Sequence, residues 1–135
     1  MKIEQLSVND WVAIDGVPSK VMSIDSVTGL LRVSGKGNPI GMGIVEPIPL
    51  TPEILEKNGF DAPKAKAWND SWYWSNRKDV ALELRESFGL WYMEIVTKEQ
   101  RSGLQSNRKL GIGFKYVHQL QNALRLAGVE KEIEL

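Results

Sequence analysis

In the first fifty residues, short apolar runs alternate with turn residues, and this pattern most constrains what the chain can fold into. Asp15-Gly16 and residues 25–29 separate the runs, and Asp-Gly pairs are typical of tight turns because glycine adopts positive φ without strain. Short strands at regular spacing predict an antiparallel meander or a small barrel. The runs are Val12–Ile14, Val21–Ile24, Leu30–Val33 and, weakened by two glycines, Ile40–Val45.

A short helix is predicted directly after this β module. Thr51 suits the N-cap, Pro52 suits the first helical position, and Gly59 offers a left-handed stop. Phe60 is placed to pack back on Leu55, as commonly happens at such a helix end.

The second half of the chain predicts a β-hairpin and one long helix. Apolar residues at every second position of 80–85 indicate a strand, and 90–96 supplies its partner after the break at Gly89. A helix through 80–96 is the alternative, because leucine and glutamate favour helices. In residues 116–127, Val117, Leu120 and Leu124 form an apolar stripe, and we expect this helix to cover one face of the hairpin sheet.

These elements predict an α+β protein. An N-terminal antiparallel β module is followed by a short capped helix and by an antiparallel hairpin unit packed by one amphipathic C-terminal helix. The expected division places the β module and short helix in 1–60, a linker in 61–70, and the hairpin and helix in 71–135. The linker is predicted because 61–67 contain a proline and no large apolar residue. The two parts are also short enough to form one compact domain together.

Composition limits the classes of function. The 135 residues carry 17 Lys and Arg against 17 Asp and Glu, and a net charge of zero argues against gripping duplex DNA by bulk charge. No cysteine is present, which excludes disulfides and thiolate metal sites. No apolar run approaches the roughly 20 residues of a membrane span, and the start lacks the apolar core of a signal peptide. We therefore expect a cytoplasmic protein.

Two resemblances add to these patterns. The succession Asp10-Trp11-Val12, Asp15-Gly16, Lys20-Val21, Ile24-Asp25 and Thr28-Gly29 resembles SH3-like small barrels. Residues 3–12, 46–60 (EPIPLTPEILEKNGF) and 115–124 (KYVHQLQNAL) resemble a family of short proteins of Bacteroides-type gut bacteria and their phages or mobile elements. That family has no established activity, so the resemblance supplies no catalytic residue. It implies a small accessory protein of phage or prophage origin.

Nothing in the pattern of residues predicts an enzyme. His118 is the sole histidine, and no partner spacing supports a Ser-His-Asp relay or a metal site, so we expect a surface or boundary residue of the long helix. The glycine-rich residues 35–43 lack the Gly-Lys-Ser/Thr of a P-loop and predict a flexible connection. Asp10, Asp15 and Asp25 fall at strand ends and turns, where aspartate bonds the local backbone. We expect no catalytic residue, no metal and no cofactor.

An aromatic cluster is the best candidate for a ligand or partner surface. Trp72, Tyr73 and Trp74 are followed by Arg77 and Lys78. The tetrapeptide Ser-Asn-Arg-Lys occurs at 75–78 and again at 106–109. Three interpretations stay open: a small core with Tyr73 outward, a protein interface, or a stacking platform for nucleotides. The candidate surface comprises Trp72, Tyr73, Trp74, Arg77, Lys78, Arg101, Arg108 and Lys109.

The distribution of charge places this surface in the basic middle of the chain. Residues 62–115 hold ten basic and six acidic side chains, whereas 1–61 hold five and eight. The function predicted is that of a non-enzymatic binding or adaptor protein, with a protein partner or self-association. The alternative is a module that binds single-stranded nucleic acid or a nucleotide through the Trp-rich basic segment.

Overall fold

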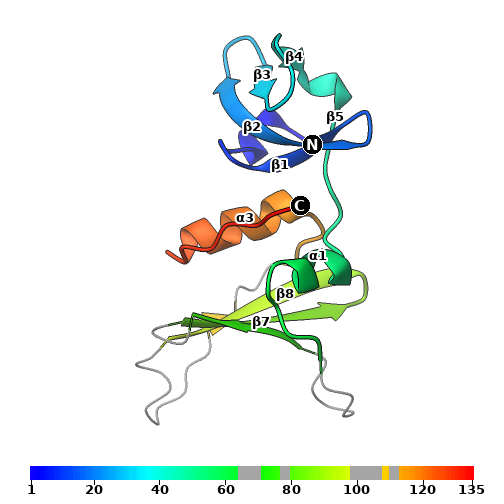
Figure 1. Cartoon of the computed structure of the whole chain (residues 1–135). Helices are drawn as coiled ribbons and strands as arrows, with labels where there is room; N and C mark the ends of the chain where they lie inside the picture. Colours follow the sequence, from blue (N-terminus) through cyan, green and yellow to red (C-terminus); the bar gives the residue numbers. More distant parts are fainter. Residues whose placement is uncertain (64–70, 77–79, 98–107, 110–112) are drawn as a thin grey trace. The chain divides into compact units, whose positions relative to one another are not determined.

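The computed structural model describes residues 1–63, 71–76, 80–97, 108–109 and 113–135 of the chain (Figure 1). In this part the protein is α+β, with two antiparallel sheets and two α-helices, as predicted. Contacts group the chain into two units. The first, called the barrel unit after the SH3-like barrels that its sequence resembles, contains Met1–Pro49, Tyr116–Ile133 and Leu135. The second, the hairpin unit, contains Leu50–Lys115 and Glu134.

The barrel unit is a five-stranded antiparallel sheet in the order β4-β3-β2-β1-β5. The long β2 pairs with both β1 and β3, and β5 returns to pair with β1. β4 and β5 stand at opposite ends of this order, so the small SH3-like barrel that the sequence resembles stays a prediction. The strands are β1 (Trp11–Ile14), β2 (Val17–Asp25), β3 (Leu30–Val33), β4 (Ile40–Gly41) and β5 (Val45–Glu46), with 3-10 turns η1 (Ile3–Gln5) and η2 (Met42–Ile44).

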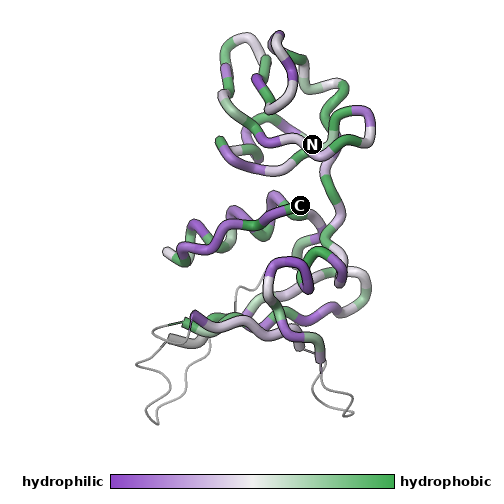
Figure 2. The backbone as a smooth tube through the Cα atoms, viewed as in Figure 1, coloured by the Kyte–Doolittle hydropathy of each residue, from purple (hydrophilic) through white to green (hydrophobic). Residues whose placement is uncertain are grey.

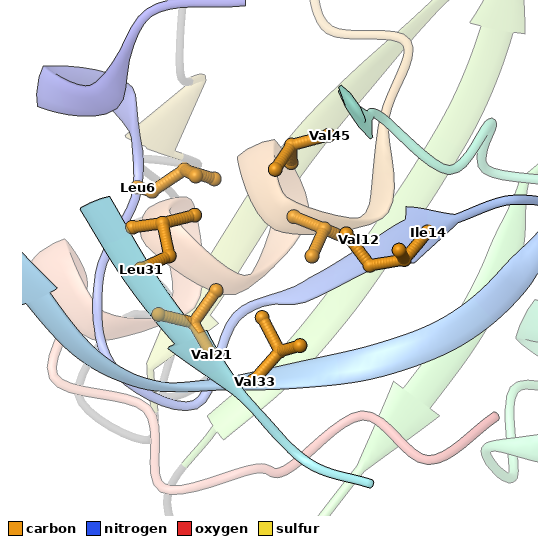
Figure 3. Packing of buried hydrophobic residues seen from close by; sticks show 7 residues of the cluster. All are labelled: Leu6, Val12, Ile14, Val21, Leu31, Val33 and Val45. Atoms are coloured by element: carbon orange, nitrogen blue, oxygen red, sulfur yellow. The ribbon is translucent and has the colours of Figure 1, made fainter. Parts of the chain in front are cut away.

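Alternating apolar residues of these strands form the core of the barrel unit. In β1 and in β3 every second side chain is buried, which is the period-two burial of a half-buried strand. Figure 3 shows seven of these side chains gathered on one another. They are Leu6, Val12, Ile14, Val21, Leu31, Val33 and Val45, each at most 7% exposed.

Two turns behave as the sequence predicts. Asp15 and Gly16 have φ of 50° and 77° and join β1 to β2 in a two-residue turn, which glycine makes accessible. The Asp25 carboxylate accepts the backbone N–H groups of Val27 and Thr28 at 3.0 and 3.2 Å. The Thr28 bonds hold the pKa of this carboxyl below its usual value.

The predicted strand over Ile40–Val45 is wrong in extent. Only Ile40 and Gly41 pair with β3, residues 42–44 form the 3-10 turn η2, and Val45 begins β5. Gly41 and Gly43 bring no side chain to pack against a neighbouring strand, so the ladder ends early.

α3 (Val117–Leu126) is the predicted long helix, and its apolar stripe is buried: Val117, Leu120 and Leu124 are at most 1% exposed. Figure 2 shows hydrophobic and hydrophilic residues interleaved along it. Gly128 has a φ of 71°, and the Val129 N–H bonds the Leu124 carbonyl at 2.9 Å, which closes the helix as expected. The predicted packing of this helix on the hairpin joins two units and stays a prediction.

The hairpin unit begins with α1 (Pro52–Lys57), whose ends match the prediction. The Thr51 hydroxyl accepts the Ile54 N–H at 3.4 Å, Gly59 has a φ of 82°, and the Phe60 N–H bonds the Leu55 carbonyl at 3.0 Å. The described part of the sheet has the order β6-β7-β8-β9. Its strands are β6 (Trp72–Ser75), β7 (Val80–Ser87), β8 (Leu90–Thr97) and β9 (Arg108–Lys109).

The hairpin prediction is confirmed and the alternative helix is excluded, because β7 and β8 pair in register from Val80↔Thr97 to Ser87↔Leu90. On the buried face, Leu82 stands opposite Ile95 and Leu84 opposite Met93, and all four are at most 5% exposed. Cross-strand apolar pairs of this kind are what stabilise an antiparallel sheet.

The grouping of residues differs from the expected division at 61–70. The short helix α1 lies in the hairpin unit, whereas the C-terminal helix α3 lies in the barrel unit. Asp61, expected in the linker, pairs its backbone with Tyr73 of β6, and residues 64–70 lie outside the described part. The hairpin unit is thus inserted in the chain between the barrel strands and α3. Its two ends meet, because Leu50 N–H bonds the Lys115 carbonyl at 2.8 Å.

Candidate functional site

The predicted aromatic site lies on β6, at one edge of the described sheet. The register pairs Trp72 with Leu84 and Trp74 with Leu82, and both leucines are fully buried. Residues paired across strands share a face, and neighbours in one strand point to opposite faces. Both tryptophans therefore stand on the buried face of the sheet, and Tyr73 stands on the opposite face.

Trp74 packs within its own unit. Its ring centroid lies 6.5 Å from that of Phe60, with the ring planes tilted by 41°, and Phe60 is only 3% exposed. Both Trp72 and Trp74 are partly buried, and Tyr73 keeps 40% of its surface exposed. These contacts favour the interpretation of the cluster as a small core with Tyr73 turned outward.

The basic part of the predicted surface cannot be assembled from the described residues. Arg77, Lys78 and Arg101 lie outside them. Arg108 and Lys109 form the short strand β9, and their backbones pair with Ile95 and Glu94 respectively. A basic patch at this sheet edge therefore stays a prediction.

The outer face of the sheet combines tyrosines with carboxylates. Tyr73 stands opposite Glu83, which in turn stands opposite Glu94 on β8. In a neighbouring row, Arg85 stands opposite Tyr92, which is 38% exposed. The two carboxylates in the row of Tyr73 repel phosphate, whereas the row of Tyr92 holds the cation of Arg85. This face therefore mixes both signs of charge, which is typical of the polar part of a protein interface.

The tip of the β7–β8 hairpin carries an exposed aromatic side chain in a strained position. Phe88 and Gly89 form the two-residue turn between Ser87 and Leu90, with φ of 52° and 79°. Turns with two positive φ values favour Asn-Gly, and a bulky residue at positive φ is a conformational outlier. Phe88 is nevertheless there, and its side chain is fully exposed.

The break at Gly89 predicts a turn between the two strands, but no sequence pattern predicts the exposed aromatic side chain at its tip. The available signal was the residue type itself: Phe-Gly occupies a turn position where Asn-Gly or Asp-Gly is usual.

A polar network fastens α3 to the segment before β1 in the barrel unit. The Arg125 guanidinium donates to Asp10 at 2.6 Å, and Asp10 is fully buried. The other Asp10 oxygen accepts the Ser7 N–H at 2.8 Å, which is the local backbone bond expected of it. Gln121 accepts the Trp11 N–H at 2.9 Å and donates to the Asn9 carbonyl at 3.0 Å. No sequence motif marks these long-range partners.

A cavity of about 570 Å³ adjoins this network. It lies within the barrel unit, between Asn9 and Lys20 on one side and the segment Gly128–Ile133 that follows α3 on the other. Gln121 and Arg125 contribute to its wall. Its size falls within the usual range for small-molecule sites.

His118 is buried, with 3% of its surface exposed, so the prediction of a surface or boundary residue is wrong. Its ring stacks on Tyr116 with centroids 5.9 Å apart, and its Nδ1 has no hydrogen-bond partner in the described structure. Burial lowers the pKa of this imidazole, and the negative charge of Asp10 partly opposes that shift. Within the described residues no carboxylate or hydroxyl bonds this nitrogen, so the relay geometry of a nucleophilic site is not formed around it.

No family model, curated protein or solved structure matches this chain. The described residues contain no group of three or more His, Asp or Glu side chains arranged to hold a metal ion. Neither described α-helix has the length and hydropathy of a membrane span.

Proposed function

We propose that the protein is a non-enzymatic binding protein that contacts a protein partner through the tip of the β7–β8 hairpin. The observation that supports this function is Phe88, fully exposed and held at a φ of 52°. A non-glycine residue in the left-handed region costs about 1–3 kcal/mol, and strain of this kind is concentrated at functional sites. An aromatic ring that contacts water on all sides returns none of that cost in the isolated chain.

The hairpin is a rigid support for such an anchor. Eight residue pairs connect β7 and β8, and three buried side chains of β8, Trp91, Met93 and Ile95, anchor the strand that follows the tip. The Trp91 indole N–H also bonds the Leu50 carbonyl at 3.2 Å. A rigid support lowers the conformational entropy lost on binding, so most of the gain from burying one aromatic ring is retained.

The charge beside the tip favours a protein as the partner. Glu86 is exposed two residues before Phe88 and stands opposite Trp91 in the register. Surfaces of anionic lipid and of nucleic acid attract segments with an excess of cations, whereas Glu86 balances the exposed Arg85 beside this tip. An apolar protein pocket with a basic rim complements a phenyl ring next to a carboxylate, and aromatic side chains are enriched at the centres of such interfaces.

The test is affinity capture from a lysate of the native host with three forms of the chain. Phe88→Asn removes the anchor and suits the turn, and Val27→Asn is the matched control, because Val27 is 94% exposed in a turn of the other unit. We expect a discrete protein to be retained by the parent and by Val27→Asn and lost with Phe88→Asn. If all three forms retain the same proteins, or the parent retains nothing beyond Phe88→Asn, the proposal fails.

Binding of single-stranded nucleic acid or of a nucleotide by Trp72, Tyr73 and Trp74 is the alternative proposal. It predicts salt-sensitive quenching of tryptophan fluorescence by oligonucleotides that Phe88→Asn leaves unchanged. The hairpin-tip proposal predicts no such quenching. Either function would act in the cytoplasm, and a small accessory protein of phage or prophage origin fits both.

A further inference from the structure

The cavity of the barrel unit has fixed walls. The Trp11 indole N–H donates to the Ile133 carbonyl at 2.7 Å and so fastens the segment after α3 to β1. On the opposite side, Gln121 is 7% exposed and holds both the Asn9 carbonyl and the Trp11 N–H. At the start of the segment, the Val129 N–H bonds the Leu124 carbonyl. Because protein bonds hold all three walls, a ligand would enter a preformed space of about 570 Å³.

Lys20 supplies this cavity with a cation. Its Nζ lies 5.3 Å from the centroid of the Trp11 ring, which orients the ammonium group. In the described part of the chain no carboxylate lies within salt-bridge distance of Lys20. Arg125, the second basic residue of the wall, is by contrast bound to Asp10 at 2.6 Å.

The other residues that line the cavity favour a ligand with a single negative charge. Lys131 is partly buried, and desolvation lowers its pKa, so an anion placed nearby would stabilise its charged form. Glu130 and Glu132 also line the cavity, and their carboxylates repel a dianion more than a monoanion. Val129 and Ile133 add apolar surface.

We propose that this cavity binds a small amphipathic monocarboxylate, with the carboxylate at Lys20 and the apolar part against Val129 and Ile133. The proposal is independent of the hairpin tip, because Phe88 and the cavity belong to different units. A free carboxylic acid and the C-terminal carboxylate of a peptide present the same group, and the experiment separates these two sources.

The experiment follows the indole N–H resonance of Trp11, which bonds the cavity wall, by NMR of the full chain. The probes are hexanoate, hexanol, inorganic phosphate, and the tripeptide Ala-Ala-Leu with a free or an amidated C-terminus. We expect hexanoate or the free tripeptide to shift this resonance saturably, and hexanol, phosphate and the amide to leave it in place. Tighter binding of hexanoate identifies a free acid as the natural class, and tighter binding of the tripeptide identifies a polypeptide C-terminus.

Two variants test whether the positive charge of Lys20 binds the carboxylate of the ligand. Lys20→Met keeps an unbranched side chain but removes the charge, and it should weaken carboxylate binding by about tenfold or more. Lys36→Met is the matched control, because Lys36 is an exposed loop lysine of the same unit outside the cavity, and its binding should match the parent. The proposal is overturned if hexanol shifts the resonance as hexanoate does, if phosphate binds at least as tightly, or if no carboxylate shifts it. Those three outcomes use the parent chain and do not depend on the folding of a variant.

Discussion

At the residue scale, the proposed function depends on a side chain that occupies a turn position for which its type is poorly suited. Phe88 combines positive φ with full exposure, so neither its backbone nor its ring contributes to the stability of the free chain. Asparagine adopts the left-handed region more readily than any bulky residue. Stability and binding are therefore expected to change in opposite directions when this residue is replaced.

Phe88→Asn should raise the free energy of unfolding by about 1 kcal/mol, because the strain is relieved and no buried contact is lost. Urea denaturation of the parent and the variant measures the change. Val27→Asn, in an exposed turn of the other unit, should stay within about 0.5 kcal/mol of the parent. A lower stability of Phe88→Asn would show that the phenyl ring packs on the protein itself and is not available to a partner.

His118 gives the barrel unit a predictable dependence on pH. Desolvation lowers the pKa of the folded imidazole below the 6.5 of the unfolded chain, so the unfolded state binds more protons near that pH. The stabilising contribution of neutral His118 is therefore complete above pH 6.5 and declines as the pH falls towards the folded pKa.

Denaturation of the parent between pH 7 and pH 5 should show this decline, and His118→Leu should show a flatter profile over the same window. NMR titration of the His118 ring checks the sign directly. A folded-state pKa above 6.5 would contradict the assignment of burial as the dominant cause.

At the element scale, sequence patterns predicted the helices and the hairpin well, because their signals are local. The cap at Thr51, the stops at Gly59 and Gly128, and the period of two in β7 all act within a few residues of themselves. The predictions that were wrong concern features set by residues distant in the sequence. The strand expected at Ile40–Val45 depended on partners that pair with only its two ends, and the burial of His118 depends on what packs over the helix.

The buried apolar stripe of α3 allows a test of whether this helix belongs to the hydrophobic core. Leu120 is fully buried, so Leu120→Asp should abolish folding, since an unpaired carboxylate would replace a buried leucine. Leu126 on the same helix is 89% exposed, and Leu126→Asp should melt close to the parent. Thermal melting of both variants measures the effect. If Leu120→Asp is as stable as the parent, the assignment of Leu120 to the core is wrong.

At the scale of the whole molecule, contacts group residues from both ends of the chain into one unit, whereas the sequence predicts two consecutive parts, a division that stays a prediction. The barrel unit draws on both ends of the chain, because Gln121 and Arg125 of α3 bond the segment before β1. Side-chain pairs separated by more than a hundred residues leave no periodic trace in a sequence. For the same reason the cavity and the Asp10–Arg125 pair could not be predicted, whereas the outward position of Tyr73 could.

This grouping predicts that a fragment of residues 1–60 is not an autonomous domain. The fragment keeps all five barrel strands but lacks α3, so the Asn9 carbonyl and the Trp11 N–H lose their Gln121 partner and Asp10 loses Arg125. We expect poorly dispersed amide resonances for the fragment and dispersed ones for the full chain. A well-dispersed fragment spectrum would favour the division at residue 60.

Photo-crosslinking from position 88 tests the central claim, that the hairpin tip is the partner surface, most directly. Phe88 is replaced by p-benzoylphenylalanine, another aromatic side chain, and the chain is irradiated in its native host, with the same replacement at Val27 as control. The account predicts one discrete crosslinked protein from position 88 and none from position 27. The absence of a discrete adduct from position 88, or the same adduct from both positions, would contradict it.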